Sequence, residues 1–297
     1  VTVRAGQTLA IVGESGSGKS TLAKVVSGLI PASEGRVCIA GTDVARVPVG
    51  ARHPDLRRRV QMVFQNPDAT LNPSHTVEYA LMRPLKRLRG LAANAARAEA
   101  ARLVERVRLP RDLLAHKPHQ LSGGQRQRVA IARALAGNPD LVIADEPVSA
   151  LDVSVQAAIV NLLGDLLESS ELGLLLISHD LGLVRHMADW VAVMYLGRIV
   201  EYGPAAQVFA PPYHPYTEAL LAAAPRPDPE SAAPTVLLDG AMPSPSAKIT
   251  GCPFASRCPR KLGAICDSTP PPVHEFGGHR IACHIDFAAA ASHAPAA

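Results

Sequence analysis

Residues 13–21 read GESGSGKST and directly follow the apolar run TLAIV at residues 8–12. The stretch fits the phosphate-loop pattern, in which a glycine is followed by four residues and then by Gly-Lys-Ser. A strand before it and a helix after it are the context that the pattern requires. Glycines let the backbone curl so that successive N–H groups point inward, and the N-terminus of the following helix adds positive charge. The residues predicted to bind phosphate are Gly13, Glu14, Ser15, Gly16, Ser17, Gly18, Lys19, Ser20 and Thr21.

Lys19 and Ser20 have the most specific roles within this loop. The lysine of such a loop reaches the β- and γ-phosphates of a nucleotide, and the hydroxyl that follows it ligates Mg²⁺. Kinases, GTPases and motor proteins share the loop, so it predicts phosphate binding without deciding between functions.

Length and composition are those of an ordinary globular chain. Its 297 residues can bury a large core, in one large domain or two smaller ones. Apolar residues make up 47% and charged residues 19%, and no uncharged apolar run approaches the roughly 18 residues that span a bilayer. No signal-peptide pattern opens the chain. The net charge of +4, without a dense basic block, argues against nucleic-acid binding as the main activity.

Apolar runs alternate with helical patterns, which predicts an α/β fold. TLAIV, RVQMVF, DLVIAD and LGLLLIS are expected to be strands of a mainly parallel sheet with helices on both faces. Residues 66–135, rich in Ala, Leu, Arg and Glu, predict a helical subdomain. We expect a nucleotide-binding domain over residues 1–223, a Pro-rich linker over 224–250, and a small cysteine-rich C-terminal extension over 251–297 with a disordered tail.

Two carboxylates, Asp145 and Glu146, follow the apolar run LVIA. Successive side chains on a strand point to opposite sides, so the two can have different roles. Asp145 is predicted to hold Mg²⁺, directly or through water, and Glu146 to polarise the attacking water as general base. Gln65, at the end of RVQMVFQ, has a neutral amide able to contact both Mg²⁺ and that water. A solvated acidic strand end is the alternative interpretation.

His179 lies at the end of another expected strand, at the edge where open α/β sheets bind ligands. It is predicted to hydrogen-bond the γ-phosphate and the water; a plain structural role is the alternative. Ser178, His179 and Asp180 together suggest a hydrolase triad. Neighbours in sequence, however, cannot place nucleophile, base and orienting group in line, which excludes that interpretation.

A second glycine-rich stretch, LSGGQ at residues 121–125, precedes the helical pattern QRQRVAIARALA. Ser122 is predicted to cap this helix, and Gly123 and Gly124 to permit close approach of a phosphate. One phosphate loop already supplies a cradle. The second anion site must therefore serve another nucleotide, or the opposite face of the same one.

Taken together, these motifs resemble the ATP-binding cassette (ABC) family over nearly the whole chain. The matching segments are 13–21, Gln65, 121–125, 141–146, the SALD loop at 149–152, and His179. The resemblance implies a P-loop NTPase of ABC type, in which LSGGQ of one subunit closes over the ATP held by the phosphate loop of the other, so that two chains sandwich two ATPs. The residues implied to contact nucleotide from this second side are Ser122, Gly123, Gly124, Gln125 and Asp152.

Narrower features are similar to the ATPase subunits of bacterial dipeptide/oligopeptide importers: QNPDATLNP, EPVSALDVSVQ, HPYTEALLAAAP and a cysteine-containing tail. This resemblance implies peripheral attachment at the cytoplasmic face of the inner membrane and assembly with a second cassette and two permease subunits. The segment after Gln65 would contact the permease, and a solute-binding protein would be an indirect partner. Dipeptide, oligopeptide, nickel and glutathione import are not separated by these residues.

The alternative function is that of a non-transport ABC ATPase acting on nucleic acid or the ribosome. Repair ATPases of this kind carry long coiled coils, and the helical stretch of about 55 residues before LSGGQ leaves no room for one. The resemblance to importers therefore favours transport, with no nucleic-acid partner.

The chain starts at Val1, twelve residues before the phosphate loop. In the ABC family, earlier strands carry an aromatic side chain that stacks on adenine, and we expect them to be missing. Either an N-terminally truncated subunit or one half of a fused double cassette would explain such a start.

Four of the five cysteines lie near the C-terminus, separated by five, seven and sixteen residues. These gaps match neither common zinc modules nor ferredoxins. A segment poor in apolar residues nevertheless needs a staple, which favours a metal centre. The importer resemblance implies a [4Fe-4S] cluster with Cys252, Cys258, Cys266 and Cys283 as ligands. Zinc and free thiols in a reducing cytosol are the alternatives, and the spare candidate ligands are His274, His279 and His284.

Overall fold

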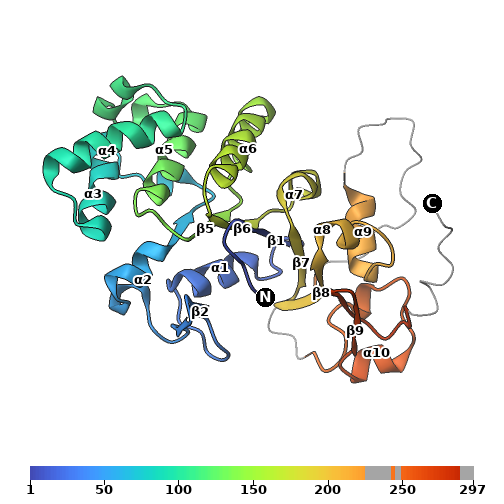
Figure 1. Ribbon diagram of the computed structural model, residues 1–297. Helices are drawn as coiled ribbons and strands as arrows, with labels where there is room; N and C mark the ends of the chain where they lie inside the picture. The colour runs from blue at the N-terminus through green and yellow to red at the C-terminus, as the bar shows by residue number, and fades with distance from the viewer. Residues whose placement is uncertain (225–241, 245–248, 288–297) are drawn as a thin grey trace. The chain divides into compact units, whose positions relative to one another are not determined.

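The computed structural model describes residues 1–224, 242–244 and 249–287 (Figure 1). Contacts divide the chain into two compact units, each built from two segments. The first unit comprises residues 1–8 and 20–177, and the second comprises residues 9–19 and the described residues from Ser178 onward. The chain passes between the units within strand β1 (Thr8–Val12), within helix α1 (Lys19–Ser27) and again after Ile177.

Three parallel strands form the centre of the first unit: β4 (Val60–Val63), β5 (Leu141–Asp145) and β6 (Gly173–Ile177). All of β6 is buried, and β5 is buried from its second residue on. Unbroken apolar runs of this kind suit parallel strands covered on both faces. The predicted strands at these positions are confirmed. The unit also contains a short hairpin of β2 (Cys38–Ile39) and β3 (Thr42–Asp43).

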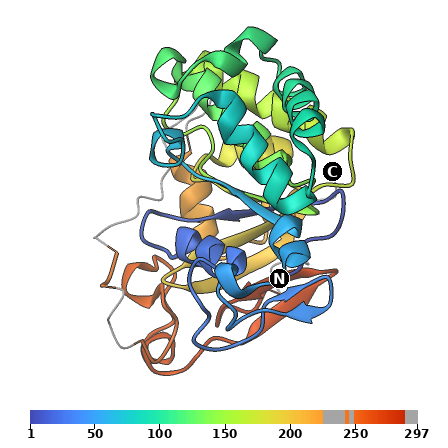
Figure 2. The ribbon, with the colours of Figure 1, turned by 90° about the vertical axis from the view of Figure 1, so that its left-hand side faces the viewer.

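Helices make up most of the remaining first unit: α2 (Pro54–Arg59), α3 (Val77–Arg89), α4 (Ala93–Arg106), α5 (Gly123–Leu135) and α6 (Val153–Glu168). Helices α3 and α4 lie side by side in both views (Figure 1, Figure 2). The buried residues of α3 are Val77, Leu81 and Leu85, spaced by four so that they share one face. The helical character predicted for residues 66–135 is confirmed, with short 3₁₀ turns between the helices.

The strands of the second unit are mostly antiparallel. Strand β1 pairs in parallel with β7 (Trp190–Tyr195), but β7 and β8 (Arg198–Pro204) form a hairpin. The turn residues Leu196 and Gly197 both have positive φ, 44° and 77°, as a two-residue hairpin turn requires. β10 (His279–Ala282) pairs antiparallel with β8 and with β9 (Val273–Phe276). The fold is therefore mixed α/β, and the prediction of a mainly parallel sheet is only partly correct.

The second unit also contains four helices among its described residues: α7 (Leu181–Met187), α8 (Ala205–Val208), α9 (Pro215–Ala223) and α10 (Ala264–Ser268). Its C-terminal part has an apolar cluster that the sequence did not predict, in which Ile281, Cys283 and Phe287 are buried against Phe276 and Ile285. Most of the predicted linker, and the end of the tail, lie outside the described residues. Within the ranges that the structure describes, every helix is too short or too polar to cross a membrane.

Candidate functional site

The phosphate loop lies between β1 and α1, and its shape depends on glycine. Gly13, Gly16 and Gly18 have φ values of 148°, 85° and 103°, which side chains with a Cβ rarely adopt. Gly13 has a further constraint, because a Cβ placed on it would lie 2.2 Å from the carbonyl oxygen of Met194 in β7. Gly13 is therefore required for two reasons: its backbone has a positive φ, and strand β7 leaves no space for a Cβ.

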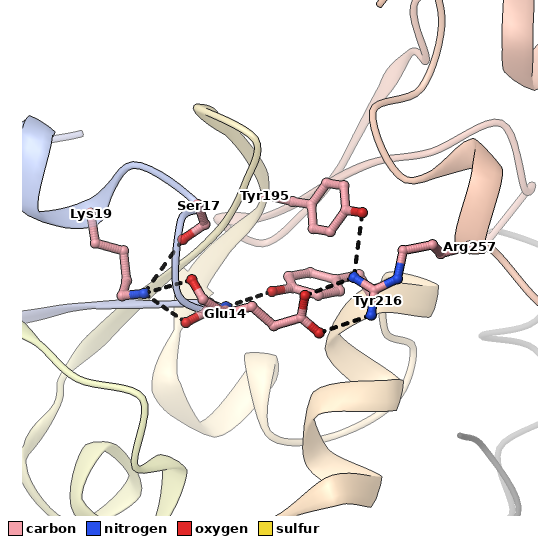
Figure 3. A network of polar contacts seen from close by, with 7 residues as sticks. Glu14, Ser17, Lys19, Tyr195, Tyr216 and Arg257 are labelled. Atoms are coloured by element: carbon pink, nitrogen blue, oxygen red, sulfur yellow. Dashed lines mark hydrogen bonds and ion pairs between the residues drawn. The ribbon is translucent and has the colours of Figure 1, made fainter. Parts of the chain in front are cut away.

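Lys19 is buried against the loop. Its Nζ donates to the carbonyl oxygens of Gly13 at 2.7 Å and Glu14 at 2.8 Å, and Ser17 Oγ lies 3.5 Å away (Figure 3). Only 5% of Lys19 is exposed. The ammonium thus places a positive charge directly against the curled backbone, which suits a phosphate-binding loop.

Glu14 is placed differently from the other predicted phosphate-binding residues. Its carboxylate accepts a hydrogen bond from Arg257, and its N–H group donates to the Tyr216 hydroxyl. Ser15, Gly16, Ser20 and Thr21 are exposed, and Ser17 is buried.

Ser20 and Asp145, far apart in sequence, meet in the first unit. The Ser20 hydroxyl donates to Asp145 Oδ1 at 3.1 Å, and Asp145 is 7% exposed at the end of β5. A hydroxyl and a carboxylate oxygen are ligands that Mg²⁺ accepts in proteins. The donor set at this position fits the predicted metal ion.

Glu146 follows β5 directly and leaves the strand conformation, with a φ of 46°. Its N–H donates to Ile177 O at 2.9 Å. Its Oε2 accepts a hydrogen bond from Gln65 Nε2 at 3.0 Å, and the same nitrogen lies 3.2 Å from Ser149 Oγ. Strand alternation, from which we predicted opposite directions for the two carboxylates, does not extend to Glu146. A left-handed backbone at a non-glycine residue costs about 1–3 kcal/mol and is concentrated at functional sites.

LSGGQ forms the start of α5. Ser122 Oγ accepts from the Gln125 N–H at 3.3 Å, and Gln125 Oε1 accepts from the Ser122 N–H at 2.9 Å, so the predicted helix cap is confirmed. A Cβ on Gly124 would lie 2.5 Å from Val155 Cγ1 in α6. Gly124 thus has a packing role inside its own chain that the sequence did not reveal, because the position of α6 is not visible in LSGGQ.

Asp152 caps α6. Its Oδ1 accepts from the Val155 N–H at 3.0 Å and from the Ser154 hydroxyl at 2.8 Å. These hydrogen bonds hold the pKa of the Asp152 carboxyl below its usual range. The carboxylate predicted to act on a nucleotide is thus also a helix cap.

His179 is exposed and lies between β6 and α7. Its neighbours are used locally: Ser178 Oγ accepts from the Asp180 N–H at 3.0 Å, and Asp180 Oδ1 accepts from the N–H groups of Gly182 and Leu183. The hydroxyl and carboxylate therefore form a turn and a helix cap, in keeping with the exclusion of a hydrolase triad.

The four C-terminal cysteines do not form a metal centre in the structure. Cys252, Cys266 and Cys283 are buried and Cys258 is partly exposed. Burial, and to a smaller extent the other three thiols, raises the pKa of Cys252 to about 11. Throughout the described ranges, no three His, Cys, Asp or Glu side chains come close enough together to hold a metal ion. The predicted [4Fe-4S] cluster, and zinc as its alternative, are not supported.

The spare histidines contact protein groups. His274 Nε2 lies 2.9 Å from Cys283 O, His284 Nε2 lies 2.9 Å from Thr269 O, and His279 Nε2 lies 2.7 Å from Glu201 Oε1. The contacts of His274 and His284 lie within the extension, whereas that of His279 reaches Glu201 in β8.

Two regions of the chain match known protein families. The family described as "ABC transporter" matches residues 1–149, and "Oligopeptide/dipeptide transporter, C-terminal region" matches residues 200–266. A peptide ABC transporter ATP-binding protein of Sinorhizobium fredii is 49% identical over 98% of this chain and 82% of its own length. A peptide import ATP-binding protein of Brucella abortus is 45% identical over 96% of this chain and 84% of its own length.

Two solved structures share the fold. An ATP-binding cassette in a dimeric, post-hydrolysis state bound to ADP and phosphate is 32% identical, with a TM-score of 0.60 over 69% of this chain and 88% of its own. The cbiO1 protein of Clostridium perfringens, part of the cbiONQ ABC transporter complex, is 30% identical, with a TM-score of 0.63 over 70% of this chain and 81% of its own. The chain therefore belongs to the ATP-binding proteins of the ABC transporter family, and within them to the group with an oligopeptide/dipeptide transporter C-terminal region.

Proposed function

We propose that this chain hydrolyses ATP to power the import of di- or oligopeptides through a transmembrane permease. The observation that carries the proposal is the match of residues 200–266 to the peptide-transporter C-terminal region, together with near full-length similarity to peptide import ATP-binding proteins. Fold alone would not distinguish transport from other uses of an ABC ATPase.

Different residues of this chain have different roles in ATP hydrolysis. Lys19 and the loop N–H groups bind the β- and γ-phosphates, and His179 hydrogen-bonds the γ-phosphate. Ser20, Gln65 and Asp145 would hold Mg²⁺, which neutralises charge on the phosphate oxygens. Glu146 accepts a proton from the attacking water. The Gln65 amide, whose Nε2 lies 3.0 Å from Glu146 Oε2, orients the Glu146 carboxylate.

A second cassette completes the site. Ser122 is exposed at the N-terminus of α5, a 13-residue helix whose N-terminal end favours an anion. We assign Ser122, Gly123, Gly124, Gln125 and Asp152 to the ATP bound by the partner cassette. The dimeric cassette among the related structures supports an arrangement of this kind.

A groove of about 330 Å³ in the first unit is the proposed contact with the permease. The segment after Gln65 lines it with Thr70, Leu71 and Asn72, and α3 contributes Tyr79 and Arg83. Tyr79 is 50% exposed, unusually open for an aromatic ring. A cytoplasmic helix of the permease, with an apolar face and an acidic edge, fits this lining. The chain would then lie peripherally at the inner face of the membrane.

Reconstitution tests the proposal. The chain is incorporated with its permease and partner cassette into liposomes, and ATP hydrolysis and uptake of labelled di- and oligopeptides are measured. We expect peptide uptake that depends on ATP and disappears with Glu146→Gln. If hydrolysis were stimulated by nucleic acid or ribosomes and no peptide were taken up, the chain would instead be a non-transport ABC ATPase.

A further inference from the structure

One arginine of the C-terminal extension contacts the phosphate loop. Arg257, in the 3₁₀ turn Ala255–Arg257, donates to both carboxylate oxygens of Glu14 at 2.7 and 3.2 Å. The Arg257 side chain is 7% exposed and that of Glu14 26%. Figure 3 shows Lys19 and Arg257 on opposite sides of Glu14. The second residue of the loop thus faces the extension, whereas Lys19 lies against the loop backbone.

A tyrosine engages the main chain of the same loop residue. The Glu14 N–H donates to the Tyr216 hydroxyl at 2.8 Å. Tyr216 is completely buried, and its ring lies against those of Tyr195 and Phe254, with centroids 4.7 and 5.3 Å away. Burial raises the pKa of the Tyr216 hydroxyl, so it remains protonated. Glu14 is therefore held through its backbone and its side chain by residues that lie 202 and 243 positions later.

The support beneath Tyr216 is itself firmly held. His214 caps α9 by accepting the Tyr216 N–H on Nδ1 at 3.1 Å. The His214 N–H donates to Glu201 Oε2 at 2.9 Å, and His279 Nε2 lies 2.7 Å from the other oxygen of that carboxylate. Glu201 and His214 are each 1% exposed. Helix α9 is thereby joined to β8 and, through His279, to β10.

The Glu14 carboxylate has an electrostatic consequence. A negative charge beside a loop that binds a polyphosphate repels the ligand, unless a cation neutralises it. Arg257 supplies that cation in a partly buried ion pair. The pair is bidentate, which is the strongest arrangement of a guanidinium and a carboxylate. The extension thus orients Glu14 and cancels its charge.

We propose that Arg257 and Tyr216 are positioning residues for the phosphate loop: they hold Glu14 in place and neutralise its charge, so that the C-terminal extension sets the affinity of the loop for ATP. Glu14 is then an anchor of the loop and not a phosphate ligand. The inference rests on the proposed function only in that the loop binds ATP.

The extension contains a matched control pair. Arg280 donates to both carboxylate oxygens of Glu275 at 2.9 and 3.4 Å, but the two side chains are 54% and 52% exposed and lie in β10 and β9. The full chain and its variants are titrated with MgATP and a fluorescent ATP analogue. We expect Arg257→Gln to raise the dissociation constant about tenfold, within the usual range of coupling between sites. Arg280→Gln should change it less than twofold. The KM for ATP should rise in parallel, with kcat at saturating ATP within twofold of wild type.

A double variant separates charge compensation from simple loss of structure. Glu14→Gln combined with Arg257→Gln should bind the analogue more tightly than Arg257→Gln alone, because no unneutralised carboxylate remains beside the phosphates. Equal or weaker binding by the double variant would overturn the inference, as would unchanged affinity in a folded Arg257→Gln protein.

If Arg257→Gln fails to fold, Tyr216→Phe provides the test through hydrogen exchange without nucleotide. Loss of the hydroxyl should speed exchange of the Glu14 amide, and unchanged exchange there would refute the anchor. A wild-type chain that does not bind the analogue would refute the proposed function instead. If the wild type binds the analogue but Arg257→Gln, the double variant and Tyr216→Phe all behave like the wild type, the positioning role is refuted and the proposed function is not.

Discussion

The two glycine-rich stretches use glycine for different physical reasons. In GESGSGKS, three glycines adopt positive φ, and the loop carries its own cation, since Lys19 Nζ lies against the carbonyl oxygens of Gly13 and Glu14. In LSGGQ, Gly123 and Gly124 begin the regular helix α5, and the space that a Cβ on Gly124 would need is occupied by Val155 of α6. Glycine content alone therefore does not define a phosphate site. The backbone conformation and the neighbouring element decide what each glycine does.

The largest expected effect concerns the chemistry that the first stretch serves. Glu146→Gln removes the general base but retains a side chain of the same shape beside Gln65, so ATP should still bind. Hydrolysis should fall by about 10²-fold or more, the usual size of general-base effects. Single-turnover hydrolysis and analogue binding are measured together. Turnover at the wild-type rate would remove Glu146 from the role of base.

Gly13→Ala tests the conformational role of glycine in the first stretch. The new Cβ would meet the Met194 carbonyl oxygen at 2.2 Å, so the loop must shift. We expect a cost of about 2 kcal/mol or more in ATP binding, or ~30-fold in the dissociation constant. Gly41→Ala is the control, because Gly41 also has positive φ (80°) but nothing within 4 Å. Equal loss of affinity in both variants would show that the effect is not specific to the phosphate loop and its contact with β7.

Gly124→Ala tests the packing role of glycine in the second stretch. Its Cβ would lie 2.5 Å from Val155 Cγ1, whereas a Cβ on Gly123 would meet its nearest neighbour, Leu151, at 3.3 Å. Overpacking of this kind costs about 1–3 kcal/mol in the free energy of unfolding. Gly123→Ala should cost less than half as much. Denaturant unfolding of the isolated chain measures both, and an undiminished stability in Gly124→Ala would return this glycine to a purely ligand-binding role.

Acid should weaken the support of the phosphate loop through His214. Burial lowers the pKa of His214 to about 3, below the ordinary value of 6.5. The neutral form is therefore favoured in the folded state. Its contribution to stability is complete above pH 6.5 and declines as the pH falls from there toward 3. Between pH 7 and 5.5 the loss from this residue is about 1 kcal/mol.

His214→Asn sharpens that measurement, because an Asn side chain can still cap α9 and does not titrate. Unfolding is followed at both pH values in wild type and variant. The wild type should lose more stability on acidification than the variant, and parallel losses would contradict the assignment to His214.

Local sequence was sufficient for much of the fold and the site. The strands at TLAIV, RVQMVF, DLVIAD and LGLLLIS, the cap at Ser122 and the family itself depend on short-range patterns: apolar runs, helix caps and glycine spacing. These patterns are local because hydrogen bonding and steric limits act within a few residues. The pairing of Ser20 with Asp145 was also foreseen in type, since both were assigned to one metal ion.

Tertiary structure decided the features that depend on which distant segments meet. Nothing in GESGSGKST indicates that Glu14 turns to Arg257, and nothing in LSGGQ indicates that Val155 lies against Gly124. The antiparallel strands β8, β10 and β9 follow from a hairpin turn and from the pairing of residues about 80 positions apart. The low apolar content of the C-terminal segment and the importer resemblance suggested a metal centre, but an apolar cluster that includes Cys283 stabilises that region in the structure. Sequence by itself determines local conformation and chemical type, whereas partners are chosen by packing, because contact energies depend on distances that only the folded chain defines.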